Sequence, residues 1–180
     1  NGVYIELNTN ELYGRNLTAG ALDVMGQYYS VASSSHAFYN YGGLVYTGND
    51  EKALFDNMWQ KCYAVIACCN TIIEKCDENK AGLSPVWRGS IKGEALALRA
   101  MLHFDMLRLF GPLTSELDKE SIPYQTNSDQ TVTPLLSGSE VVGLILDDLK
   151  NAVGLLKDTD PYFVEEEFSD TDLNYRRFRM

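Results

Sequence analysis

Apolar residues recur at alternating steps of four and three positions between about Asn49 and Asn79, which is the spacing of an amphipathic α-helix. The repeating residues are Phe55, Trp59, Cys62, Ile66, Cys69, Ile73 and Cys76. Asn49 or Asp50 is expected to cap the N-terminus of this helix. The pattern predicts one long helix with a single buried face, on which Trp59 lies in the core.

A second helix is predicted from Pro85 to about Phe110. Ser84 can cap it, and proline suits the first helical position because the N–H that it lacks would be unpaired there. Apolar residues cover much of its circumference, so neighbours are expected on several sides. Gly111-Pro112 ends the helix. A short connection makes the two helices an antiparallel hairpin of the kind that stacks in tetratricopeptide-like arrays.

A third helix is predicted to begin near Ser139, with Asp147-Asp148 on its solvated side. Its apolar face holds Val141, Leu144, Ile145, Leu149, Val153 and Leu156. The stretch from Thr114 to Gly138, rich in Ser, Thr, Pro and Asp, is expected to be an irregular surface excursion. These elements predict an all-α fold of tetratricopeptide-like helical hairpins with long irregular loops. The length favours one domain over residues 1–180.

The formal charge of −10 argues against partners that are themselves anionic, such as nucleic acid or an acidic lipid surface. The basic cluster Arg176-Arg177-Arg179 is interpreted as the start of a helix rather than as a binding patch. A run of about 18 apolar residues is absent, so no transmembrane helix is expected, and the first residues carry no signal-peptide pattern. Any membrane attachment would need a lipid anchor that this chain does not contain.

Four cysteines, Cys62, Cys68, Cys69 and Cys76, lie within fifteen positions and suggest a metal site or disulfides. On a helix, residues seven apart are separated by about 10 Å along the axis, which is too far for a disulfide or for shared zinc ligation. We therefore expect buried free thiols that behave as small apolar side chains.

Candidate catalytic groups do not form a recognisable set. His36 lies in a loop and His103 in the second helix, and neither belongs to a catalytic motif. The acidic run Glu165-Glu166-Glu167, with Asp170 and Asp172, is better explained as a solvated tail than as a glycosidase carboxylate pair. Phosphate-binding glycine motifs are absent. No catalytic residue, cofactor or metal site is expected, and the chain is predicted not to be an enzyme.

The segment from Tyr28 to Gly48 concentrates aromatic rings beside Ser, Asn and Gly. Flat rings stack on sugar faces, while amides and hydroxyls pair with sugar hydroxyls. The predicted ligand contacts are Tyr39, Asn40 and Tyr41 at the surface, with His36 as a weaker candidate. Alternatively, each of these rings pins the loop to the helices.

Five stretches, taken in order, resemble the SusD/RagB-like nutrient-binding outer-membrane lipoproteins. They are Asn1-Gly2-Val3-Tyr4 with Leu12-Tyr13-Gly14; the Trp59, Tyr63, Ile66, Asn70 and Ile73 helix; Lys92 to Ala100 through Leu109-Phe110-Gly111-Pro112; Ile122-Pro123-Tyr124; and Ser139-Glu140-Val141 with Ile145, Asp148, Leu149 and Ala152. The family's lipidated N-terminal cysteine and long C-terminal half are not in this sequence. The chain therefore resembles the family's N-terminal helical domain.

The resemblance implies tetratricopeptide-like helical hairpins at the cell surface, on the outer membrane. It also implies non-catalytic binding of an oligosaccharide or polysaccharide for delivery to a SusC-like TonB-dependent transporter. A helical-repeat scaffold for protein–protein interaction is the alternative. Within the shared motifs, Glu94, Arg99 and Asn70 are expected to anchor neighbouring helices through buried hydrogen bonds rather than to touch a ligand.

Overall fold

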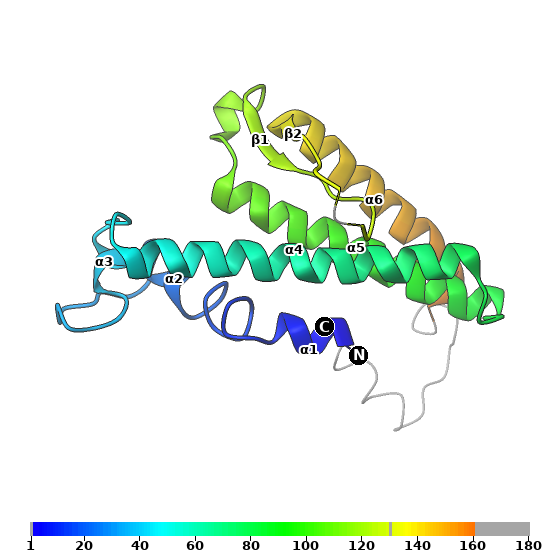
Figure 1. Ribbon diagram of the computed structural model, residues 1–180, viewed down its shortest axis with the longest axis horizontal. Coiled ribbons are helices and arrows are strands. Elements are labelled where there is room, and N and C mark those ends of the chain that lie inside the picture. The colour runs from blue at the N-terminus through cyan, green and yellow to red at the C-terminus, as the bar shows by residue number, and fades with distance from the viewer. Residues whose placement is uncertain (1, 130, 161–180) are drawn as a thin grey trace. The chain divides into compact units, whose positions relative to one another are not determined.

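The computed structural model describes residues 2–129 and 131–160 and is mostly helical (Figure 1). Within them lie the helices α1 (Gly2–Leu7), α2 (Ala21–Met25), α3 (Tyr39–Gly42), α4 (Asn49–Glu78), α5 (Pro85–Phe110) and α6 (Gly138–Thr159). One 3₁₀ turn, η1 (Thr114–Glu116), and two short strands, β1 (Glu120–Pro123) and β2 (Leu135–Ser137), separate α5 from α6. The predicted all-α class of helical hairpins is confirmed.

The ends of the long helices follow from local chemistry. The Ser84 hydroxyl accepts a hydrogen bond from the Trp87 N–H, as expected of an N-cap, and α5 begins at the following proline. At the start of α6, Ser137 and Glu140 form a reciprocal capping box. The prediction for α4 was wrong in one detail, because Asn49 and Asp50 lie within the first turn rather than ahead of it.

The connection between α5 and α6 is more regular than the sequence predicted. β1 and β2 pair antiparallel, with Glu120 opposite Ser137 and Pro123 opposite Leu135, and the register is irregular between them. Ile122 is fully buried. The expectation of an irregular excursion was therefore wrong, because a short ladder and the buried side chains of Ile122 and Tyr124 order part of the segment.

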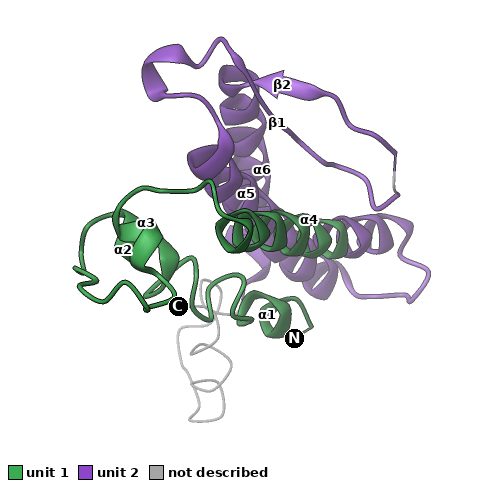
Figure 2. Ribbon diagram, turned by 60° about the vertical axis from the view of Figure 1, so that its left-hand side comes forward, with its two compact units in different colours: residues 1–68 green, residues 69–180 purple. Residues whose placement is uncertain are grey.

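The chain divides into two compact units, residues 1–68 and residues 69–180 (Figure 2). The first twenty residues of α4 belong to unit 1, and its last turns belong to unit 2. In unit 1, α1 is tied to α4 by an ion pair between Glu6 and Lys61. The core of this unit includes Leu12, Met58 and Ile66, all fully buried.

In unit 2, the end of α4 and the helices α5 and α6 enclose a second core around Ile73, Leu96 and Ala152. Lys92 of α5 also pairs with Asp77 of α4. Gly93 allows α5 and α6 to approach closely, since a Cβ at this position would lie 2.7 Å from Leu156 Cγ. In this unit the predicted hairpin of α4 and α5 is joined by apolar contact and an ion pair, and α6 packs closely on α5 at Gly93.

Burial confirms most of the predicted face of α4, but not all of it. Cys62, Cys69 and Cys76 are buried free thiols as predicted, whereas Cys68 is exposed. Burial raises the pKa of the Cys76 thiol. Trp59 is half-buried and was wrongly predicted to lie in the core. The centroid of its ring lies 4.7 Å from that of the Tyr63 ring.

The buried face of α6 differs from the predicted one at two places. Asp148 is buried, so Asp147-Asp148 is not a solvated pair. Leu149 and Val153, which were expected in the apolar face, are exposed. The buried face is instead formed by Val141, Ile145, Asp148 and Ala152. Because Asp148 is buried, the inward face of α6 differs from the face that the apolar residues alone predict.

Candidate functional site

The aromatic segment of unit 1 contains a single turn of helix, α3, which carries three of the four predicted ligand residues. The Gln27 side chain donates a hydrogen bond to the Gly42 carbonyl and so ties the end of this turn to the neighbouring segment. The turn places Tyr39 and Asn40 at the surface and turns Tyr41 inward.

Tyr41 lies at the centre of an aromatic cluster and is only 2% exposed. Its ring meets those of Phe38, Tyr46 and Phe55 at centroid distances of 5.8, 6.4 and 6.1 Å. Burial is the main cause that raises the pKa of its phenol. The expectation of a surface Tyr41 was therefore wrong, and the ring fastens the aromatic segment to α4 within unit 1.

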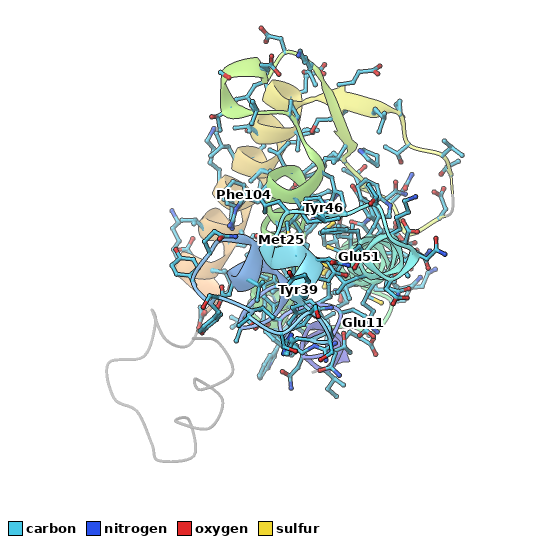
Figure 3. All side chains as sticks on the ribbon, turned by 90° about the vertical axis from the view of Figure 1, so that its left-hand side faces the viewer. Glu11, Met25, Tyr39, Tyr46, Glu51 and Phe104 are labelled. Atoms are coloured by element: carbon cyan, nitrogen blue, oxygen red, sulfur yellow. The ribbon has the colours of Figure 1, made fainter. Side chains whose placement is uncertain are left out.

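Tyr39 is exposed over 42% of its surface, and Figure 3 labels it together with Tyr46 and Glu51. Asn40 is exposed, and its amide nitrogen donates a 2.7 Å hydrogen bond to Glu51 Oε1. His36 is also exposed, and its Nδ1 accepts a hydrogen bond from the Phe38 N–H. Tyr39, Asn40 and His36 thus lie at the surface, and local hydrogen bonds hold Asn40 and His36 there, whereas Tyr41 is buried.

A hollow of about 390 Å³ opens within unit 1 beside His36, Asn40 and Tyr41, whereas Tyr39 does not line it. It is lined by Arg15, Ser35, His36, Ala37, Phe38, Asn40, Tyr41, Asp50, Glu51 and Leu54. The Arg15 guanidinium lies over the Phe38 ring, 5.8 Å from its centroid. Hydroxyl, imidazole, amide and carboxylate groups therefore converge beside aromatic carbon, which is the chemistry that polar, hydroxyl-rich ligands require.

Unit 2 contains a buried polar network around Arg99. Its guanidinium donates two hydrogen bonds of 2.7 Å to the Asp148 carboxylate and one of 2.8 Å to Asn70 Oδ1. The Tyr124 hydroxyl donates to the same carboxylate at 2.6 Å. Burial and this bond raise the pKa of Tyr124, and Asp148 raises that of Arg99 against the opposing effect of burial. Arg99 and Asn70 are thus structural, as predicted.

His103 completes the network and is fully buried. Its Nε2 accepts a 3.0 Å hydrogen bond from the Gln125 N–H, so its Nδ1 carries the proton and donates to the Arg99 carbonyl at 2.9 Å. Its ring stacks on the ring of Tyr124, with 3.9 Å between the two centroids. Burial lowers the pKa of His103 to about 4, which keeps the ring neutral at neutral pH.

Two side chains of α4, Asn70 and Glu74, fix the polar loop at residues 125–129. Asn70 donates to the carbonyls of Gln125 and Asn127 at 3.1 and 2.8 Å. Glu74 accepts from both the N–H and the hydroxyl of Ser128, at 2.7 and 2.5 Å. No local pattern predicts this arrangement, because its partners lie more than fifty positions apart in the sequence.

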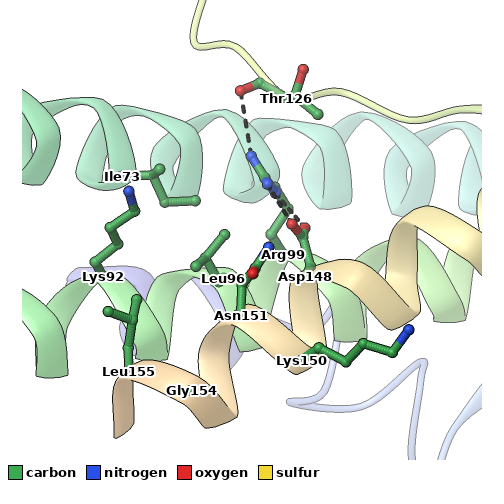
Figure 4. Close-up of a pocket in the computed structure, with 10 residues that line it drawn as sticks. All are labelled: Ile73, Lys92, Leu96, Arg99, Thr126, Asp148, Lys150, Asn151, Gly154 and Leu155. Carbon is green, nitrogen blue, oxygen red and sulfur yellow. Dashed lines mark hydrogen bonds and ion pairs between the residues drawn. The ribbon is translucent and has the colours of Figure 1, made fainter. Parts of the chain in front are cut away.

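A second hollow, of about 690 Å³, lies within unit 2 beside this network (Figure 4). Its lining comes from the end of α4, from α5, from the polar loop and from α6. The lining residues are Ile73, Lys92, Leu96, Arg99, Thr126, Asp148, Lys150, Asn151, Gly154 and Leu155. None of them was predicted from the sequence to contact a ligand.

Residues 2–129 and 131–160 contain no group of three or more His, Cys, Asp or Glu side chains placed to hold a metal ion. No helix in this part of the chain combines the length and apolarity needed to cross a membrane. The acidic run at 165–167, Asp170, Asp172 and the basic cluster at 176–179 lie outside the described residues.

Comparisons with family models, curated proteins and solved structures agree with one another. A SusD-like family model, described as starch-binding and associating with the outer membrane, matches residues 7–169. A SusD-like protein from Formosa agariphila is 34% identical over 96 residues, which make up 52% of this chain and 17% of that protein. A crystal structure of a SusD superfamily protein from Bacteroides thetaiotaomicron has a TM-score of 0.66 at 20% identity, covering 86% of this chain and 35% of that one.

The structural match supports the fold, and the chain spans only about a third of that solved relative. The family model, by contrast, extends over most of the sequence, from the core residue Leu7 through all three long helices. The resemblance seen in the five sequence stretches is thereby confirmed, and the chain belongs to the SusD-like family.

Proposed function

We propose that this chain takes part in non-catalytic binding of an oligosaccharide or polysaccharide at the cell surface, and that the hollow of unit 1 supplies part of the contact. The observation that carries the proposal is the convergence of Ser35, His36, Asn40 and Glu51 on a hollow bordered by the Phe38 ring. Carbohydrate sites need this mixture of ring faces and directional polar groups. The starch-binding description of the family agrees with it.

Each predicted ligand residue then has a distinct role. The exposed ring of Tyr39 stacks on an apolar sugar face. Asn40 and His36 exchange hydrogen bonds with sugar hydroxyls, and the bond from Asn40 to Glu51 sets the orientation of the amide. Tyr41 acts beneath them as the support that holds α3 in place.

The absence of catalysis is part of the proposal and is supported by how the histidines are used. Both ring nitrogens of His103 are engaged in buried hydrogen bonds to backbone groups. A general base must reach the proton that it removes, which the buried ring of His103 cannot do. His36 is exposed, and its Nδ1 accepts a hydrogen bond from the Phe38 N–H, so we assign it to hydrogen bonding with the ligand and not to catalysis.

Delivery of the glycan to a SusC-like TonB-dependent transporter, from an outer-membrane location on the cell surface, completes the proposed function. The family description, which associates its members with the outer membrane, supports this location. Attachment to the membrane would come through a lipid anchor.

Isothermal titration with a panel of oligosaccharides, including starch-derived ones, tests the proposal. We expect saturable heat for at least one glycan, with no change in its length when the products are examined by chromatography. Binding of a transporter or another protein without binding of any glycan would favour the helical-repeat scaffold instead. Shortening of the glycan would overturn the non-catalytic assignment.

A further inference from the structure

The hollow of unit 2 has the size and construction of a binding groove. Its volume of about 690 Å³ falls within the range of roughly 300–1,000 Å³ typical of ligand sites. Figure 4 shows Lys92 and Lys150 toward opposite ends of the groove, with Leu96 and Asn151 between them. One wall is fixed, because Arg99 donates to the Thr126 carbonyl at 3.3 Å and Asn70 holds the residues on both sides of Thr126.

The apolar part of the groove is aliphatic. Ile73 and Leu96 are buried core residues that face it, and Leu155 packs against the same core. No aromatic ring is among the ten lining residues. Sugar faces are bound mainly by stacking on rings, so this surface is poorly suited to a glycan and well suited to a branched aliphatic side chain.

The charged part of the groove is positive in a chain whose net charge is −10. Lys92, Arg99 and Lys150 line it against the single carboxylate of Asp148, which is already bound to Arg99. Lys150 has only a 3.6 Å contact with Asp147, and both side chains are more than two-thirds exposed. Such a pair is worth little, so Lys150 is available to an anionic ligand.

Lys92 is held more firmly, by its ion pair with Asp77 on α4. The Asp77 side chain is itself 59% exposed and does not line the groove. The carboxylate of Asp77 therefore offsets much of the charge of Lys92, and Lys150, which has only the long contact with Asp147, is the cation of the groove that can form the direct contact.

We propose that this groove binds a short extended peptide segment of a protein partner, in which a Leu, Ile or Val side chain is flanked by Asp or Glu. The aliphatic side chain lies on Ile73, Leu96 and Leu155, and the carboxylate pairs with Lys150. Asn151 and the polar loop are placed to bond the peptide backbone. This site is separate from the proposed glycan site and does not depend on it.

Gly154 makes the proposal directly testable. It lines the groove, and a Cβ built there meets no atom within 4 Å, so a larger side chain can enter the groove without disturbing the fold. Gly143 on the same helix is equally open but does not line the groove. Gly154→Phe and Gly143→Phe are therefore matched blocking and control variants.

A randomised heptapeptide library displayed on phage is panned against the 180-residue protein, with prior depletion on Gly154→Phe. We expect the retained peptides to be enriched in Asp or Glu next to Leu, Ile or Val. The affinity of one synthetic peptide is then measured by titration. Gly154→Phe and Lys150→Glu should each weaken it at least tenfold, and Gly143→Phe should leave it unchanged. Circular dichroism confirms that all variants are folded.

Several outcomes would overturn the proposal. Retained peptides rich in Lys or Arg, or no peptide that separates the wild type from Gly154→Phe, would show that the groove does not recognise acidic segments. Competition by an oligosaccharide would assign it to a glycan instead. A concentration-dependent dimer in sedimentation, abolished by Gly154→Phe but not by Gly143→Phe, would assign it to a second copy of the chain.

Discussion

Arg99 of α5 and Asp148 of α6 are joined by two parallel hydrogen bonds of 2.7 Å, and both side chains are at least nine-tenths buried. The fork geometry of the guanidinium matches the carboxylate, which makes this a strong form of ion pair. Tyr124 and Asn70 satisfy further polar atoms of the pair. The two helices are therefore linked by a polar contact in the middle of their interface.

Removing one charge of this pair should be costly, because the other would stay buried without compensation. We expect Asp148→Asn to lower the free energy of unfolding by about 3–5 kcal/mol. Its neighbour Asp147, which is exposed, provides the control, and Asp147→Asn should change stability by less than about 0.5 kcal/mol. Urea denaturation measures both variants, and equal stabilities would contradict the structural role of the pair.

His103 should make stability depend on pH. Its folded pKa of about 4 lies below the ordinary value of 6.5, so the unfolded state binds the proton more readily. The stabilising contribution is complete above pH 6.5 and is lost as the pH falls toward 4. We expect a loss of about 3 kcal/mol between pH 7 and pH 4 from this residue. His103→Gln, which can keep one donor and one acceptor, should flatten the pH dependence, as urea titrations at several pH values would show.

The aromatic segment separates ligand contact from structural support. Tyr39→Ala should weaken glycan binding by about 1–2 kcal/mol, roughly tenfold, with little change in melting temperature, because the ring is exposed. Calorimetric titration and thermal melting measure the two effects.

Tyr41 should behave in the opposite way. Its ring is buried, so Tyr41→Ala should destabilise unit 1 by about 3–5 kcal/mol. Tyr41→Phe should be nearly neutral, since the hydroxyl has only a 3.5 Å contact with the Asp50 carbonyl. A folded Tyr41→Ala variant that loses only glycan affinity would restore Tyr41 as a direct ligand contact.

The neighbouring residues Met58 and Trp59 test which face of α4 is buried. Met58 is fully buried, so Met58→Ala should cost about 2–5 kcal/mol. Trp59 is half-buried, so Trp59→Ala should cost less than the value of about 3–5 kcal/mol expected for a core tryptophan. A larger effect at Trp59 than at Met58, measured by urea denaturation, would contradict the observed orientation of the helix.

The sequence by itself determined the long helices, the places where two of them start and the family. Apolar periodicity and caps act over a few neighbouring positions, so the start of α5 could be placed from Ser84 and Pro85 alone. The burial of Cys62, Cys69 and Cys76 followed from the same periodicity. The helices, their starting points and the buried face of α4 could be predicted because they depend on residues that are close to one another along the chain.

Only the tertiary structure decided which polar side chains are buried and which rings are exposed. Asp148 turned inward because Arg99, forty-nine positions earlier, offers its charge, and no local pattern encodes that partner. Tyr41 and Tyr39 are two positions apart in the same aromatic segment, and the single turn of α3 buries one and exposes the other. The groove of unit 2 likewise joins residues from Ile73 to Leu155, because a concave site forms only where distant segments pack together.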